Sequence, residues 1–103
     1  RPKIQNKIAD FDKYDTIFVG YPIWWGDLPM IMYSFFEDYK FDGKDVIPFN
    51  THEGSGDAGT YDKIQSKLPS AKVNNKGLAL DGKTARSDDG KQQTVQWLKG
   101  LGY

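Results

Sequence analysis

The chain has 103 residues, with 14 basic and 14 acidic side chains and a formal net charge of zero. This length fits one domain, and the balanced charge argues against a protein that binds nucleic acid, which would carry a basic surplus. The lack of cysteine excludes disulfides, zinc–thiolate sites and thiol nucleophiles. The longest uncharged run, Thr16–Gly26, is far shorter than a membrane span of about 20 residues, so we expect a soluble, cytoplasmic domain.

The first elements predicted along the chain are a helix and a strand. Ile4 and Ile8 lie four residues apart among polar neighbours, which is typical of a short amphipathic helix over Lys3–Ala9. Thr16–Gly20 follows as a continuous apolar and β-branched run. Such a run is the pattern of a parallel strand that is buried on both faces.

A second helix is predicted after Asp27, which we expect to be its N-cap, with Pro29 in the first turn. Its apolar residues form one stripe at helical spacing: Leu28, Ile31, Met32, Phe35, Phe36 and Tyr39. Asp45–Phe49 then predicts a second strand. Because Pro48 cannot donate a ladder hydrogen bond, we expect a bulge or an early end there.

A third helix is predicted between the glycine-rich segment that follows the second strand and Pro69, which stops it. Either Ser55 or Asp57 is its expected N-cap. Its expected inward residues are Ala58, Tyr61, Ile64 or Gln65, and Leu68.

The last third of the chain predicts a short strand, Gly77–Leu80, then a polar loop over Asp81–Gly90 and a final helix. The polar loop lacks the glycine and glutamate spacing of a calcium loop. Asp88 or Asp89 is the expected N-cap of the final helix, and its expected inward residues are Val95, Leu98 and Leu101.

Strands that alternate with helices predict an α/β fold, with a parallel sheet and helices on both of its faces. Functional loops in such sheets lie beyond the carboxyl ends of the strands. Two segments hold that position: Tyr21–Gly26, which we name the tryptophan loop, and Asn50–Gly56. The second segment begins the longer loop Asn50–Gly59, rich in Gly, Ser and Thr, which we name the glycine loop.

The tryptophan loop places two adjacent indoles, Trp24 and Trp25, where they cannot both enter the core without unusual geometry. They either stack on a planar ligand or cover the end of the core or a protein interface. Gly26 permits backbone conformations closed to other residues and close approach of a ligand.

The glycine loop offers small residues and backbone N–H groups that suit an anion or polar heteroatoms. His52, the one histidine, is either a general acid or base beside Glu53 or a solvated loop residue. No partners for a metal site accompany it. Gly54–Gly59 matches G-x-G-x-x-G, but four residues separate it from Phe49, whereas a dinucleotide fingerprint turns directly out of its strand.

Taken together, these segments resemble the flavodoxin-like family, most closely a bacterial branch with a Pro-x-Trp-Trp-Gly loop. The similar residues are the run Tyr14–Gly26, the spaced Pro29, Phe35 and Phe36, the pair Gly43–Lys44, and the strand end Pro48–His52.

The resemblance implies FMN bound across the carboxyl edge of a five-stranded parallel sheet. It implies that Trp24 or Trp25 stacks on the isoalloxazine and that Gly26 offers a carbonyl to the flavin N5–H. The glycine loop would face the oxygens of the ring. The implied cofactor-binding residues are Pro22, Ile23, Trp24, Trp25, Gly26, Thr51, His52, Gly54, Ser55 and Gly56.

The family's phosphate loop, of the form T-x-T-G-x-T, has no match in this sequence. By the resemblance, Lys3–Ala9 corresponds to the family's second helix, so residues 1–103 are expected to be the C-terminal portion of the domain, with three of five strands. The start without methionine agrees with that expectation. Thr16–Gly20 would then be an exposed edge strand, and we expect self-association through it.

The resemblance implies a flavin-dependent redox protein, either an electron carrier or a reductase of a small acceptor such as a quinone, and leaves open whether it is an enzyme. The neutral charge differs from the acidic character of many electron-carrying flavodoxins and leaves room for the reductase. The alternative is a non-catalytic interaction module that uses Trp24 and Trp25 as an exposed hot spot. A dinucleotide enzyme is a distant third.

Overall fold

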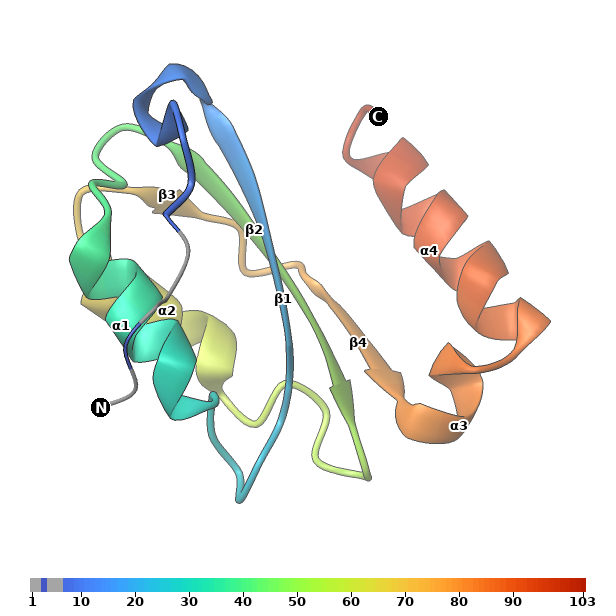
Figure 1. Cartoon of the computed structure of the whole chain (residues 1–103). Coiled ribbons are helices and arrows are strands. Elements are labelled where there is room, and N and C mark those ends of the chain that lie inside the picture. Colours follow the sequence, from blue (N-terminus) through green and yellow to red (C-terminus); the bar gives the residue numbers. More distant parts are fainter. Residues whose placement is uncertain (1–2, 4–6) are drawn as a thin grey trace.

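The computed structural model describes residue 3 and residues 7–103, which form a parallel sheet with helices on both faces (Figure 1). The predicted α/β class is therefore confirmed. The predicted helix over Lys3–Ala9 lies partly outside the described residues, since Ile4 is not among them, and residues 7–9 are not helical. A short 3₁₀ helix, η1 (Phe11–Lys13), leads into the sheet.

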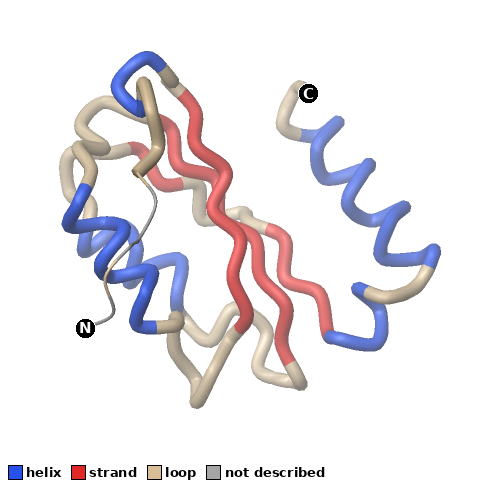
Figure 2. Tube along the Cα trace, in the orientation of Figure 1, coloured by secondary structure: helices blue, strands red, loops and turns tan. Residues whose placement is uncertain are grey.

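The sheet has β2 (Asp45–His52) at its centre, with β1 (Thr16–Pro22) parallel to it in unbroken register on one side. β3 (Lys72–Val73) and β4 (Leu78–Asp81) both pair with β2 on its other side, end to end (Figure 2). The sequence predicts three strands and the described chain has four, because residues 74–77 divide the third position of the sheet in two. Among the described strands, β1 pairs with β2 alone.

The prediction that Pro48 bulges or ends β2 is wrong, and the neighbouring strands explain why. The amide of Asn74 donates to the Val46 carbonyl, so even-numbered residues of β2 direct their backbone groups toward β3 and β4. Pro48 therefore points its nitrogen at the break between those two strands, where the ladder is interrupted. Gly77 lies in this break, where a Cβ would clash with the Pro48 carbonyl oxygen.

Figure 1 shows α1 (Met30–Asp38) and α2 (Thr60–Lys67) on one face of the sheet and α4 (Asp88–Gly100) on the other. The short α3 (Gly82–Ala85) joins β4 to α4. The prediction of a polar loop over Asp81–Gly90 is wrong, because the aspartate that ends β4 caps the first turn of α3. None of the described helices is long and apolar enough to cross a membrane.

The predicted helix N-caps are wrong in all three helices. The N-caps are Pro29, Gly59 and Ser87, in place of the predicted Asp27, Ser55 or Asp57, and Asp88 or Asp89. Gly59 has φ 73°, so a left-handed residue turns the chain into α2. Ser87 is extended, and its Oγ accepts a hydrogen bond from the Gly90 amide at 3.3 Å.

The core lies between the sheet and the layer made by α1 and α2. The predicted stripe supplies Leu28 and Phe36 to it, whereas Ile31 is exposed. Val46 of β2 and Ile64 of α2 are fully buried where sheet and helix meet. The buried cluster is Phe11, Val19, Tyr21, Leu28, Phe36, Phe41, Val46, Tyr61, Ile64, Leu68 and Ala71.

The α4 face of the sheet is covered by aromatic contacts. The Phe18 ring meets Trp97 and Tyr103 edge-on, with centroids 6.1 and 5.4 Å apart. Val95, predicted to face inward, is 42% exposed, and Trp97 takes the inward position instead. Phe18 and Phe49 remain partly exposed, so this face is less completely covered than the α1–α2 face.

Candidate functional site

The tryptophan and glycine loops meet at one edge of the sheet. Figure 1 shows them below the carboxyl ends of β1 and β2. The Ile23 amide donates to the Thr51 carbonyl at 3.0 Å, which extends the strand pairing into both loops. The first residues of each predicted loop belong to the strands, since β1 ends at Pro22 and β2 at His52.

The tryptophan loop closes in a tight reversal. The amide of Trp24 donates to the Asp27 carbonyl, and the amide of Asp27 donates back to the Trp24 carbonyl, both at 3.0 Å. Trp25 and Gly26 between them have φ of 53° and 72°. Two positive φ values in succession are the pattern of a type I′ turn. Gly26 adopts this backbone readily, whereas a bulky residue such as Trp25 is strained in it by about 1–2 kcal/mol.

This turn directs the two indoles away from the core. The Trp24 side chain is 59% exposed and Trp25 is fully exposed. Because large apolar side chains are normally buried, two adjacent exposed indoles form an unusual apolar patch at the tip of this turn.

Asp27 anchors the end of the tryptophan loop. Its Oδ1 accepts hydrogen bonds from the Leu28 amide at 2.7 Å and from the Tyr33 hydroxyl at 2.8 Å. Lys63 of α2 lies 3.1 Å from the same oxygen. Partial burial pushes the pKa of Asp27 upward, but the hydrogen bonds from Tyr33 and Leu28 and the ammonium group of Lys63 together outweigh it, so the pKa is lowered overall.

The glycine loop is shaped by left-handed backbone. Gly54, Gly56, Ala58 and Gly59 have φ of 124°, 63°, 51° and 73°. Gly54 and Ser55 are exposed, while Gly56 is half-buried. A chain that repeatedly turns in this way presents peptide N–H groups at its surface, which is the property that polar ligands require.

His52 forms a hydrogen bond within the glycine loop. Its Nδ1 accepts a hydrogen bond from the Gly54 amide at 2.9 Å, which leaves Nε2 to carry the proton of the neutral ring. Asp81 is its register partner on β4. The Thr84 amide and hydroxyl, which donate to the carboxylate of Asp81, lower its pKa. Within the described ranges, no cluster of acidic and histidine side chains fits a metal ion.

Sequence reasoning missed the buried polar network beneath the two loops. The Tyr21 hydroxyl lies 2.8 Å from Thr60 Oγ1, which donates to the Asp57 carbonyl at 2.6 Å. The Tyr61 hydroxyl donates to Asn50 Oδ1 at 2.6 Å. Burial raises the pKa of both phenols, that of Tyr21 to about 12, so both stay protonated donors. The signal for this network is Asn50, a polar residue on the same face of β2 as Val46 and Pro48.

The predicted site residues therefore divide by exposure. Pro22 and Ile23 are half-buried at the strand end, and His52 is half-buried at the start of the glycine loop. The exposed members are Trp24, Trp25, Gly26, Thr51, Gly54 and Ser55. Aromatic surface and polar backbone thus lie at one edge of the sheet.

Comparisons with known proteins decide the family. The model of the flavodoxin family matches residues 1–100. This chain belongs to the flavodoxin family. The resemblance stated from Tyr14–Gly26 and Pro48–His52 is thereby confirmed.

Two solved structures extend the comparison. A "Putative flavoprotein" from Bacteroides uniformis ATCC 8492 is 34% identical, with a TM-score of 0.77 over 93% of this chain and 59% of that chain. A protein of the same description from Bacteroides eggerthii DSM 20697 is 29% identical, with a TM-score of 0.75 over 100% of this chain and 60% of that chain. The flavodoxin-family chain thus spans about three fifths of the length of these relatives. A search of curated proteins found no match.

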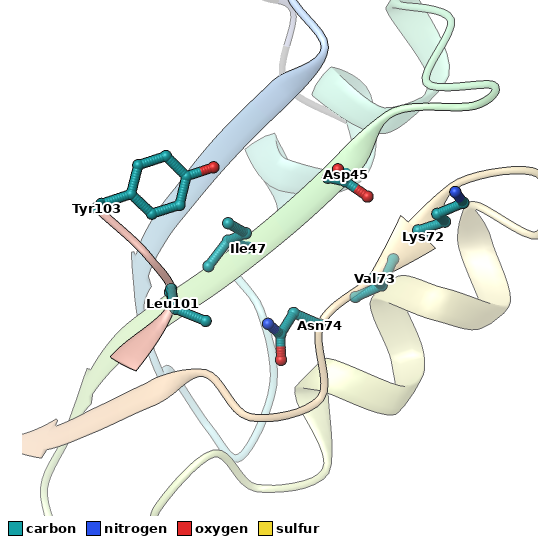
Figure 3. Close-up of a pocket in the computed structure, with 7 residues that line it drawn as sticks. All are labelled: Asp45, Ile47, Lys72, Val73, Asn74, Leu101 and Tyr103. Atoms are coloured by element: carbon teal, nitrogen blue, oxygen red, sulfur yellow. The ribbon is translucent and has the colours of Figure 1, made fainter. Parts of the chain in front are cut away.

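Two cavities of this flavodoxin-family chain lie away from the loop tips. One, of about 350 Å³, lies at the amino ends of β2 and β3 (Figure 3). Asp45 and Lys72 begin those strands, and Tyr103 and Leu101 come from the end of the chain. The other, of about 500 Å³, lies between the sheet and α4, with Phe18, Phe49 and Trp97 in its wall. Neither cavity includes the exposed indoles, although Asn50 and Thr51 of the glycine loop also line the cavity beside α4.

Proposed function

We propose that this chain carries the ring-binding part of an FMN-dependent redox protein. The observation that carries the proposal is the pair of exposed indoles on the tryptophan loop, held beside the glycine loop at the carboxyl edge of a flavodoxin-family sheet. Ligands of open α/β sheets bind at this edge. The two relatives described as flavoproteins support a flavin as the ligand.

The tryptophan loop would supply the flat surface for the isoalloxazine. Trp24 or Trp25 would stack on the ring, and Pro22 and Ile23 would carry the loop at the strand end. Gly26 would offer its carbonyl to the flavin N5–H. Because both indoles are already exposed, a flat ligand can cover them without displacing core side chains.

The glycine loop would supply the polar half of the contact. Thr51, His52 and the amides of Ser55 and Gly56 would face the oxygens of the ring, while Gly54 would contribute through its backbone conformation, because its amide donates to His52 Nδ1. Since His52 Nδ1 holds the Gly54 amide, its Nε2–H is the donor that remains for a ligand.

Bound flavin supplies hydride and electron transfer, and the protein sets its orientation and electrostatics. We propose that the complete protein passes electrons to a protein partner or reduces a small acceptor such as a quinone in the cytoplasm. The net charge of zero favours the small acceptor, because shuttles use charged surfaces to steer protein partners.

We further propose that the phosphate half of the site belongs to sequence outside these 103 residues. The relatives are longer, the T-x-T-G-x-T loop has no match here, and β1 pairs with β2 alone among the described strands. An added strand along β1 would cover an edge that otherwise favours self-association.

The test is a fluorescence titration with FMN and with riboflavin, which has the same ring and no phosphate. The chain should quench both flavins with dissociation constants that agree within about threefold, because it offers no phosphate site. A longer form with upstream sequence should bind FMN more tightly than riboflavin. Replacing Trp24 and Trp25 together with alanine should weaken binding about tenfold or more, while Trp97→Phe, on the α4 face, should leave it unchanged.

The outcomes separate the proposal from its alternative. A folded longer form that leaves flavin fluorescence unchanged would contradict the redox function, and the tryptophan loop would then be assigned to a protein interface. Binding lost in Trp97→Phe but kept in the double alanine variant would move the flavin to the cavity beside α4.

A further inference from the structure

Asn50 is a buried side chain with three hydrogen bonds at the base of the glycine loop. It is 3% exposed. Its Nδ2 donates to the Gly56 carbonyl at 3.0 Å and to the Thr51 carbonyl at 3.2 Å, and its Oδ1 accepts from the Tyr61 hydroxyl at 2.6 Å. Both polar atoms of this amide are therefore hydrogen-bonded: Nδ2 to two backbone carbonyls, and Oδ1 to the Tyr61 hydroxyl.

The Thr51 carbonyl joins the two loops. It accepts the Ile23 amide of the tryptophan loop at 3.0 Å and also Asn50 Nδ2. The same Nδ2 reaches across the glycine loop to Gly56, six residues further along the chain. Asn50 thus connects the glycine loop to the Thr51 carbonyl, which is also the hydrogen-bond acceptor for the tryptophan loop.

The bond to Gly56 also orients a peptide. In a planar trans peptide, the carbonyl and the following N–H point in opposite directions. Because the Gly56 carbonyl points inward at Asn50, the N–H of Asp57 on the same peptide points away from the buried amide. The Gly56 φ of 63° is compatible with this orientation in glycine and strained in other residues.

Tyr61 decides which end of the Asn50 amide faces the loop. A phenol donor at Oδ1 leaves Nδ2 to face the two carbonyls, whereas the reversed amide would place an oxygen against them. An aspartate here has the same shape and, when ionised, no donor, so it would repel the Thr51 and Gly56 carbonyls.

We propose that Asn50 is the positioning residue that sets the two loops relative to each other and fixes the backbone of the glycine loop that the flavin ring would contact. This inference rests on the proposed function for its ligand, and on the described hydrogen bonds for its geometry. Asn50 is itself buried and acts through the backbone of Thr51 and Gly56.

The test compares Asn50→Asp with Asn74→Asp, the same change at a half-buried residue beyond β3. Without flavin, amide hydrogen exchange at Ile23 and over residues 53–57 should accelerate at least about tenfold in Asn50→Asp and stay unchanged in Asn74→Asp. With FMN or riboflavin, Asn50→Asp should bind about tenfold more weakly at neutral pH. Lowering the pH should recover part of that loss, because the protonated carboxyl regains one donor.

Two further variants keep the outcomes distinct. Tyr61→Phe should weaken flavin binding by about threefold, since the amide keeps its donors and loses its orientation. Ile64→Val lowers the stability of the same helix without removing a polar contact, and should leave the affinity unchanged. Equal weakening by Ile64→Val, or unchanged exchange and affinity in Asn50→Asp, would overturn the inference. Accelerated exchange without any flavin binding in wild type would support the geometry and contradict the proposed function.

Discussion

The two loops at the carboxyl edge of the sheet are held in opposite ways. The tryptophan loop is fastened at the surface, where Asp27 accepts from Tyr33 and pairs with Lys63, and it exposes side chains. The glycine loop is fastened from below by the buried Asn50, and it exposes backbone. A loop that contacts a ligand through side chains can be held at few points. A loop that contacts it through peptide groups needs each of those peptides held in one orientation. Changes under the glycine loop should therefore reduce stability more than changes in the tryptophan loop.

The largest expected effect comes from Thr60→Val, which keeps the shape of a fully buried side chain and removes its hydroxyl. The Tyr21 hydroxyl and the Asp57 carbonyl would lose their partner, so we expect the free energy of unfolding to fall by about 2–3 kcal/mol. Urea unfolding measures this loss. Tyr21→Phe, which removes one end of the same chain, should reduce the free energy by about 1 kcal/mol. If the free energy of unfolding fell equally in these two variants and in a double alanine variant of Trp24 and Trp25, the proposed difference between the two loops would be wrong.

A smaller effect is expected from the backbone of the tryptophan turn. Trp25→Gly should raise the free energy of unfolding by up to about 1 kcal/mol, because glycine adopts φ 53° without strain. Gly26→Ala should lower it by about 1 kcal/mol, although nothing lies within 4 Å of the added Cβ, since φ 72° disfavours an L side chain. Thermal unfolding measures both shifts. A Trp25→Gly variant less stable than wild type would show that the contacts of the indole stabilise the fold by more than the backbone strain at this residue destabilises it.

The smallest effect concerns pH. The folded-state pKa of Asp27 is lowered, so its stabilising contribution is complete above the ordinary carboxyl pKa of about 3.9 and is lost as the pH falls through the lower folded value. Acid should therefore loosen the tryptophan loop, and Asp27→Asn should flatten the acid side of the stability curve. Unfolding measured from pH 6 down to pH 2 tests this. An acid dependence unchanged in the variant would assign the effect to other carboxyls.

The sequence predicts the framework of the fold because burial leaves a direct pattern. Thr16–Gly20 is a continuous apolar and β-branched run and is found within β1, and the positions of the two loops follow from the parallel order of the strands. The prediction that this run is buried on both faces is only partly right, because Val19 is buried whereas Phe18 and Gly20 are exposed. The predictions fail where the structure of one segment depends on the segment packed beside it. Pro48 is tolerated only because β3 and β4 are interrupted opposite it, and a single strand's sequence carries no information about that break.

The candidate site shows the same limit. Residues that carry a visible signal, such as the adjacent Trp24 and Trp25 or the glycines of the glycine loop, can be found from the sequence. The support beneath them depends on which polar residues meet after folding. Asn50 and Tyr61 lie 11 residues apart on different elements, and their hydrogen bond follows from packing α2 on β2.

The central claim is that the two loops form one flavin site, and chemical-shift mapping tests it most directly. FMN added to the ¹⁵N-labelled chain should shift the indole N–H signals of Trp24 and Trp25 and the amides of Gly26 and His52–Gly56 together, with one shared affinity. The Trp97 indole, which donates to the Lys76 carbonyl on the α4 face, should not move. Shifts centred on Trp97 and α4, or shifts in one loop without the other, would contradict the account.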